Sequence, residues 1–449
     1  THFDTSRCTD MSLMFDYCIE LTSLDVSNFN TGEVEDMSEM FSNCWKLELV
    51  GINNFNTHHV YNMSMMFNYC ENIKSLDLST FLTSSVEDFS FMFNYATKLE
   101  TININFNTEK ATKMNNMFSF CHSLKTLDLK SFDTTKVRSM ESMFDTCYGL
   151  TSLNIAKFKT NNVENMRYMF NNCRGLTSID VSNFDTAKVT SMQNMFSATE
   201  QLKSIDVSKF DTSNVVNMFN MFAYSGLTSL DLSNFNTAKV TDMSGMFYNS
   251  LNLKIIKMNN FDFNNVKTIS SIFSKCESLT SIELNKFNTV NVEYMIEVFN
   301  GCSSLLSIDL SSFVTSKVIS FYNMFNGCKS LKRLDCSSFD TSKAETFSYM
   351  FSNCESLTNL DVSNFNTANG VTMQEMFSGC KSLTSINTSK FLGEKIINAY
   401  SMFANCEKLN EINLQSFETK TLRFMENMFK NCKSARNINI PKVKTSQVN

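Results

Sequence analysis

Thirteen of the fifteen cysteines recur at a nearly constant step, each three residues after a phenylalanine. Thiols repeated in this way could form a ladder of disulfide bonds or a stack of metal sites. Neither chemistry fits the set, because four other copies carry Ala, Thr or Ser at the same position and no C-x-x-C pair occurs. A small buried side chain suits every copy, so we interpret these cysteines as packing residues and expect no metal site. The thirteen are Cys18, Cys44, Cys70, Cys121, Cys147, Cys173, Cys276, Cys302, Cys328, Cys354, Cys380, Cys406 and Cys432, and the four replacements are Ala96, Thr199, Ser225 and Ser250.

Aspartates form a second regular set, at the centre of short alternating segments. Leu24 and Val26 are expected to point inward and Asp25 outward, as in a strand with one buried face. With neighbouring serines, such aspartates would form a stripe able to bind carbohydrate, a basic protein surface or divalent cations. The alternative is a solvated stripe whose like charges are relieved by Asn replacements, nearby lysines and salt. This acidic stripe is the candidate ligand face and comprises Asp25, Asp77, Asp128, Asp180, Asp206, Asp231, Asp309, Asp335 and Asp361; Asn stands at 103, 154, 387, 413 and 439, and Gly51, Lys257 and Glu283 are exceptions.

Catalytic chemistry has little support. Of four histidines only His58 and His59 are adjacent, and no Ser-His-Asp or Cys-His arrangement, phosphate-binding glycine loop or H-E-x-x-H motif is present. We expect a non-enzymatic protein with no catalytic residues and no cofactor. The net charge of −6 gives no whole-chain case for nucleic acid.

These residues recur because the whole chain is a repeat. A phenylalanine, usually preceded by Met, returns seventeen times from Phe15 to Phe429, in steps of 26 residues with two of 25. After each strand a Thr such as Thr31 is expected to cap a helix, and Val34, Met37, Met40 and Phe41 then fall on one helical face. Asn or Gly beyond that face, as at Asn43, suits a left-handed end. The buried ladder is represented by Phe41, Cys44, Phe67, Cys70, Phe144, Cys147, Phe351 and Cys354.

The repeat predicts an α/β fold. One 26-residue unit cannot bury both a strand face and a helix face, so the units must stack. We expect a solenoid of about seventeen units over residues 1–449, each with one short parallel strand and one short helix. Seven copies place Lys just before the helix Val, where we favour solubility over a partner role: Lys110, Lys136, Lys188, Lys239, Lys317, Lys343 and Lys395.

The motif resembles a known family. The pattern L-x-x-L-x-V-x-x-F with M-F-x-x-C-x-x-L is similar to BspA-like bacterial leucine-rich-repeat surface proteins, in the 26-residue variant of surface lipoproteins. The quoted residues are Leu21, Leu24, Val26 and Phe29 for the first part and Met14, Phe15, Cys18 and Leu21 for the second. The resemblance covers the chain and implies a leucine-rich-repeat-like solenoid. It also implies an extracellular or cell-surface protein that mediates adhesion or binds protein or glycan.

Charge and order along the chain suggest a second role. Residues 1–50 hold ten acidic and two basic residues, whereas residues 401–449 hold four and eight. Both ends fall within a unit, so caps, signal and anchor are expected outside this sequence, or a second copy covers an end. The alternative function is therefore a structural module of a filament or surface layer that assembles head to tail. No apolar run approaches the roughly 18 residues of a membrane span. Residues 196–263 are the least regular, with Lys257 and Phe263 out of pattern, and we favour sequence drift over a binding site there.

Overall fold

The chain folds as a parallel β-solenoid of about 16 turns. The computed structural model describes residues 3–284 and 287–441. The chain divides into two compact units: unit 1 is Thr1–Val215 with Ser225–Leu227, and unit 2 is Val216–Tyr224 with Thr228–Asn449.

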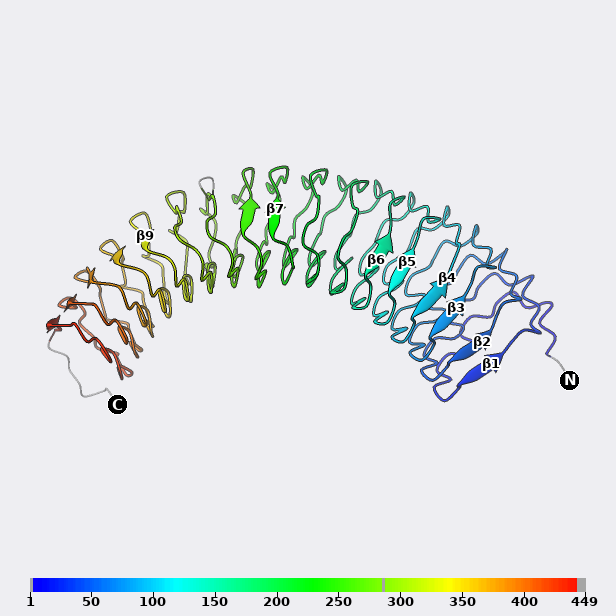
Figure 1. Cartoon of the computed structure of the whole chain (residues 1–449), viewed down its shortest axis with the longest axis horizontal. Helices are drawn as coiled ribbons and strands as arrows, with labels where there is room; N and C mark the ends of the chain where they lie inside the picture. Colours follow the sequence, from blue (N-terminus) through cyan, green and yellow to red (C-terminus); the bar gives the residue numbers. More distant parts are fainter. Residues whose placement is uncertain (1–2, 285–286, 442–449) are drawn as a thin grey trace. The chain divides into compact units, whose positions relative to one another are not determined.

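Each unit presents a row of very short parallel strands (Figure 1). Those of unit 1 are β1 (Ser23–Asp25), β2 (Leu49–Gly51), β3 (Ser75–Asp77), β4 (Thr101–Asn103), β5 (Thr126–Asp128) and β6 (Ser152–Asn154), paired as β1–β2, β3–β4 and β5–β6. Those of unit 2 are β7 (Ser229–Asp231), β8 (Ile255–Lys257), β9 (Arg333–Asp335), β10 (Asn359–Asp361), β11 (Ser385–Ile386), β12 (Glu411–Asn413) and β13 (Asn437–Asn439); β7 pairs with β8, and β9 to β13 form one sheet. The register joins equivalent residues of successive repeats, for example Leu24 with Val50.

The predicted helix of each repeat is wrong. No helix occurs among the described residues, and so none there could cross a membrane. Residues 37–44 instead form consecutive reverse turns, in which Glu39 and Asn43 adopt left-handed φ angles of 55° and 58°. The N–H groups of Met40 and Cys44 donate to carbonyls three residues earlier, at 3.4 and 3.3 Å. A continuous α-helix has neither left-handed residues nor this bonding pattern.

Alternate N–H groups of the turns point along the solenoid axis. Met37 donates to Asn62 O at 3.0 Å, and Phe41 donates to Met66 O at 3.0 Å, both in the next repeat. Backbone hydrogen bonds therefore join successive repeats on the turn side as well as on the strand side. We call this arrangement the turn ladder. It satisfies buried backbone groups that a helix would have satisfied internally.

The predicted helix caps are corrected in the same way. Thr31 is buried, and its hydroxyl donates to Asn56 O at 3.0 Å and accepts from Asn56 N–H at 2.7 Å. Thr134 makes the same pair of contacts with Lys159, at 2.9 and 2.8 Å. Since the backbone groups belong to the next repeat, this threonine links repeats rather than starting a helix.

The core consists of stacked identical positions. Phe41 and Phe67 in unit 1 have ring centroids 5.4 Å apart, and Phe325 and Phe351 in unit 2 have theirs 5.8 Å apart, with interplanar angles of 16° and 1°. Such aromatic pairs contribute about 0.5–1.5 kcal/mol each beyond burial of their area. The inward pattern of Phe and Met is thus retained although the backbone is not helical.

All fifteen cysteines are free. Cys70 Sγ donates to Phe41 O of the preceding repeat at 3.1 Å, and Cys354 Sγ contacts Phe325 O in the same way at 3.2 Å. Ser250 takes the same role with Phe222 O at 2.8 Å. The position therefore holds a compact side chain that also supplies a hydrogen-bond donor. Burial raises the pKa of Cys147, Cys302 and Cys354 to about 12.

Candidate functional site

The acidic stripe lies on the exposed side of the strands. Asp25 ends β1, Asp77 ends β3 and Asp335 ends β9, and all nine stripe aspartates are exposed. The residue before each aspartate is turned toward the core, as Leu76 is, with 7% of its surface exposed. Strand alternation therefore places the stripe, as it places any side chain between two inward residues. Serines on the same face, including Ser23, Ser75 and Ser152, are exposed beside it.

Each stripe aspartate also closes a turn. Asp25 Oδ1 accepts the N–H of Ser27 at 2.9 Å, and Asp335 Oδ1 accepts that of Ser337 at 2.9 Å. This is the Asx turn that Asp and Asn favour over other residues. Asn413 forms it too, with Gln415 N at 3.1 Å, which explains why Asn replaces Asp along the row. The seven remaining turns belong to Asp77, Asp128, Asp180, Asp206, Asp231, Asp309 and Asp361.

These turns keep the carboxylates charged. Hydrogen bonds from the residue two positions later are the main cause that lowers the pKa of every stripe aspartate. For Asp231, bonding to Ser233 and then to Lys257 lowers the pKa to about 2. The stripe is consequently anionic well below neutral pH.

Neighbouring side chains bond to part of the stripe. Asn103 Nδ2 donates to Asp77 Oδ1 at 3.0 Å, and Asn154 Nδ2 donates to Asp128 Oδ1 at 2.9 Å. In unit 2, Lys257 Nζ lies 3.0 Å from Asp231 Oδ2. Two runs of adjacent aspartates remain, 180 and 206 in unit 1 and 309, 335 and 361 in unit 2. Within the described residues, no three His, Cys, Asp or Glu side chains converge as a metal site.

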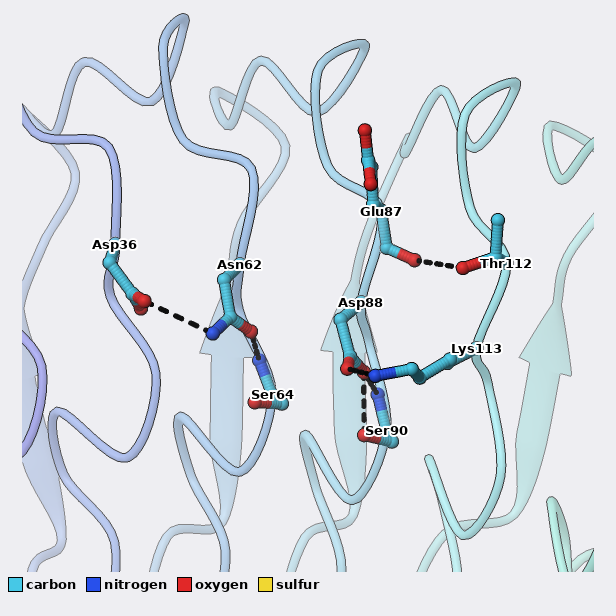
Figure 2. A network of polar contacts seen from close by, with 8 residues as sticks. All are labelled: Asp36, Asn62, Ser64, Glu87, Asp88, Ser90, Thr112 and Lys113. Atoms are coloured by element: carbon cyan, nitrogen blue, oxygen red, sulfur yellow. Dashed lines mark hydrogen bonds and ion pairs between the residues drawn. The ribbon is translucent and has the colours of Figure 1, made fainter.

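A second polar row was missed in the sequence because it falls in the segment expected to be helical. Figure 2 shows part of it, where Asn62 Nδ2 donates to Asp36 Oδ2 at 3.1 Å and Lys113 Nζ meets Asp88 Oδ2 at 2.9 Å. Asp88 Oδ1 also accepts Ser90 N–H at 2.9 Å. The signal that could have revealed this row is the Asp, Asn, Ser or Thr that recurs in most units just before the first Met or the residue that replaces it. Its side chains bond to one another, which indicates a structural role.

The seven lysines expected just before a helix lie in no helix, because no helix occurs among the described residues. Lys188 Nζ donates to Asn162 Oδ1 at 2.7 Å, and Lys395 Nζ donates to Asn369 Oδ1 at 2.7 Å. Both lysines therefore link to the preceding repeat at an exposed corner. This corner is separate from the strand face, since the buried Thr and Phe positions lie between them.

His2 lies outside the described residues, and the three described histidines do not form a recognisable catalytic group. His58 and His59 have ring centroids 4.9 Å apart at an exposed turn. His122 stacks on Tyr148 at 4.7 Å, and burial lowers its pKa. Its environment is a row of aromatic side chains in unit 1 that includes Tyr95 and Phe120, 4.1 Å apart.

The irregular positions within residues 196–263 have structural explanations. Lys257 neutralises Asp231, as above, and Phe263 replaces the linking Thr by packing against Phe287 at 4.0 Å. Thr199 stands at the cysteine position and donates to Phe196 O at 2.8 Å. These contacts support a structural role at each of the three positions.

Comparison with solved structures gives distant matches to leucine-rich-repeat proteins. One from Bacteroides ovatus is 16% identical, with 91% of this chain and 84% of that chain covered and a TM-score of 0.39. A leucine-rich cell-surface protein from Faecalibacterium prausnitzii is 13% identical, with 96% and 76% covered and a TM-score of 0.25. A leucine-rich-repeat protein of Leptospira interrogans is 12% identical, with 89% and 84% covered and a TM-score of 0.25. A search of curated proteins gave no match.

A family model matches the chain repeatedly, over residues 1–81, 63–178, 146–256, 175–282, 220–337, 267–391 and 358–449. This tiling of the repeat confirms the resemblance to BspA-like repeat proteins. The chain belongs to the family described as Mycoplasma protein of unknown function, DUF285.

Proposed function

We propose that this chain is a non-enzymatic binding protein, displayed outside the cell or on its surface, that contacts a protein or glycan through the strand face of its solenoid. The observation that carries the proposal is the acidic stripe: exposed carboxylates and hydroxyls presented at the same position of successive repeats. Strands of a sheet are about 4.8 Å apart, so the groups form a closely spaced row on a backbone fixed by two hydrogen-bonded ladders. Solenoids use such extended surfaces for recognition.

The turn side of each repeat offers fewer polar groups to a ligand. Polar side chains there, such as Asn62 and Asn94, bond to side chains of the preceding repeat, and the Phe, Met and Cys side chains are buried. The stripe aspartates instead use one oxygen for the turn and leave carboxylate surface exposed. A ligand with several cationic or hydroxyl groups would therefore find more bonding opportunities on the strand face.

The proposal is tested by screening purified extracellular-matrix proteins and glycans on arrays with the wild-type chain. A variant with Asp309→Asn, Asp335→Asn and Asp361→Asn removes three charges and retains the turn oxygens. We expect it to lose about tenfold or more in affinity for any ligand found, because several exposed charge pairs each contribute up to about 1 kcal/mol.

The matched control changes three charges on the other corner of the same unit: Lys317→Gln, Lys343→Gln and Lys395→Gln. We expect this variant to bind as the wild type does. A ligand lost by the lysine variant and retained by the aspartate variant would place the binding surface away from the stripe.

The second candidate function is a structural module that associates with its own copies. The uneven charge carries it, with ten acidic and two basic residues in 1–50 against four and eight in 401–449. Light scattering at low and high salt measures it. Growth of the particles at low salt supports head-to-tail association, and a monomer at every concentration and salt removes it.

A further inference from the structure

A hollow interrupts the strand face of unit 1 at Gly51, the last residue of β2. It has a volume of about 490 Å³ and spans β1 to β3. The register places Gly51 beside Asp25, and Asp77 holds the same position one repeat later. Every other copy of this position carries Asp, Asn, Lys or Glu. Gly51 therefore removes one side chain from the row and opens a gap between two carboxylates.

The hollow has an apolar floor and an anionic rim. Leu24, Val50 and Leu76 lie at its base, and the last two are 8% and 7% exposed. Asp25 and Asp77 form the rim, and each uses Oδ1 to accept a backbone N–H. Asp77 Oδ1 also accepts a hydrogen bond from Asn103 Nδ2 at 3.0 Å. Hydrogen bonds from Ser27 and Ser79 lower the pKa of these two carboxyl groups, so both are charged at neutral pH.

We infer that the Gly51 hollow receives a basic side chain of a protein partner, with its methylene stem on the apolar floor and its cationic head between Asp25 and Asp77. This inference rests on the proposed function and deepens it by naming the partner chemistry at one position. A lysine combines an apolar stem with a terminal charge, which matches floor and rim together. The excess of ten acidic over two basic residues in 1–50 adds long-range attraction.

A metal ion fits the same hollow poorly. Two strand steps separate the aspartates, which puts their Cα atoms about 10 Å apart. Calcium requires six to eight oxygen ligands within about 2.6 Å, and the apolar floor supplies none. The arrangement favours a long organic cation over an ion.

The probe is a five-residue peptide with one lysine between serines and glycines, compared with its norleucine counterpart. Ligand-observed NMR gives the dissociation constants, and protein labelled with ¹⁵N-glycine reports the location, because the chain has only eleven glycines. We expect the Gly51 signal to shift saturably with the lysine peptide. The norleucine peptide should bind about tenfold more weakly, since two exposed charge contacts are lost.

Gly51→Asn should reduce lysine-peptide affinity about tenfold, because it fills the gap and supplies an amide that competes for the rim charge. Asn103 shows that such an amide reaches the preceding aspartate, at 3.0 Å from Asp77 Oδ1. An added Cβ at Gly51 would lie 3.1 Å from Asp25 Oδ1, a contact that a small movement relieves. Equal thermal unfolding of this variant and the wild type establishes that the fold is intact.

Asp77→Asn provides a second variant that retains the turn oxygen. We expect affinity to fall about threefold, as one exposed charge pair is lost. The matched control is Asp133→Asn, which removes a carboxylate from another corner of unit 1 that also closes a turn, with Thr135. That control should bind the lysine peptide as the wild type does.

Three results would overturn the inference. These are no Gly51 shift up to the solubility limit of the peptide, equal binding of the lysine and norleucine peptides, or unchanged affinity in Gly51→Asn. Competition by methyl glucoside at the same affinity would also overturn it and make the hollow a sugar subsite. The array test uses aspartates of unit 2, so a failure of lysine-peptide binding would leave the proposed function standing. A failure of the array test would likewise leave the lysine-peptide result interpretable.

Discussion

At the scale of the residue, the repeats are held together by side chains that satisfy backbone groups of a neighbouring repeat. The buried Thr hydroxyl bonds both the N–H and the C=O of one residue, as Thr134 does with Lys159. The buried thiol donates to a Phe carbonyl of the previous repeat, as Cys147 does to Phe118 O at 3.0 Å. Each position therefore requires a side chain that is compact and also forms hydrogen bonds.

The Thr contact gives a direct prediction for stability. Thr134→Val keeps the shape and leaves the N–H and C=O of Lys159 without their partner. We expect the free energy of unfolding to fall by about 2 kcal/mol, since each unsatisfied buried polar group costs about 1–3 kcal/mol. Thr134→Ser keeps the hydroxyl and should cost clearly less. Urea unfolding of the two variants measures the difference, and equal losses would contradict the role assigned to the hydroxyl.

The thiols predict loss of stability in alkali. Burial raises the pKa of Cys147 and Cys354 from the ordinary 9.0 to about 12. A raised folded pKa means that the stabilising contribution is complete below the unfolded value and is lost as pH rises through the folded value. Between about pH 9 and 12 each such thiol steepens the decline by up to about 1.4 kcal/mol per pH unit.

Thermal unfolding from pH 8 to pH 11 tests this prediction. The control is the double variant Cys147→Ser and Cys354→Ser, which keeps a donor at both sites, as Ser250 does. Its stability should decline less steeply above pH 9 than that of the wild type. Parallel curves for the two proteins would show that these thiols do not titrate with unfolding.

At the scale of the element, the inward residues could be predicted and the backbone could not. Met37, Met40, Phe41 and Cys44 are all fully buried, as an amphipathic helix requires. Consecutive turns with a left-handed residue every fourth position bury the same set. The left-handed conformation of Glu39 distinguishes the turns from a helix, and no Gly or Asn at that position indicates it in the sequence. Spacing alone could not separate the two backbones.

The side chain at the second left-handed position is a sensitive point of the turn ladder. Asn353 has a φ of 56°. Asn353→Val places a branched side chain in a conformation that costs L-residues about 1–2 kcal/mol, so stability should fall by that amount. Asn353→Gly should change it little. Denaturant unfolding separates the two, and equal stability of the Val variant would contradict the left-handed turn.

The turn ladder also predicts the spectrum of the whole chain. Far-ultraviolet circular dichroism should lack the double minimum of an α-helix, because no described segment has helical hydrogen bonds. One short helix in every repeat would instead give a strong helical signal. A clear helical double minimum would therefore contradict the consecutive turns and support one short helix in every repeat.

At the scale of the whole molecule, the acidic stripe was located from the sequence, but its role in closing turns was missed. The period-2 pattern around Asp25 placed the aspartates outward, as the structure has them. The turn that each closes could have been read from the Ser two residues later, as in Asp25 and Ser27. The Gly51 hollow could not be predicted from the sequence. A missing side chain leaves a cavity only where the neighbouring side chains surround it, and the structure was needed to place them.

A charged binding face predicts a salt dependence. Screening length falls from about 10 Å at 0.1 M salt to about 3 Å at 1 M. Affinity for a ligand bound by the acidic stripe should therefore weaken steadily with salt in an isotherm series. The variant with Asn at 309, 335 and 361 should show a shallower dependence, and an identical slope would separate binding from these carboxylates.

The most direct test of the account is a hydroxyl-radical footprint of the chain with and without its ligand from the arrays. Side chains on the strand face should become protected on binding, including those of β9 to β11 and the turns that follow. The exposed lysine corner at Lys317, Lys343 and Lys395 should react unchanged. Protection at that corner, with the strand face still reactive, would contradict the assignment of binding to the strand face.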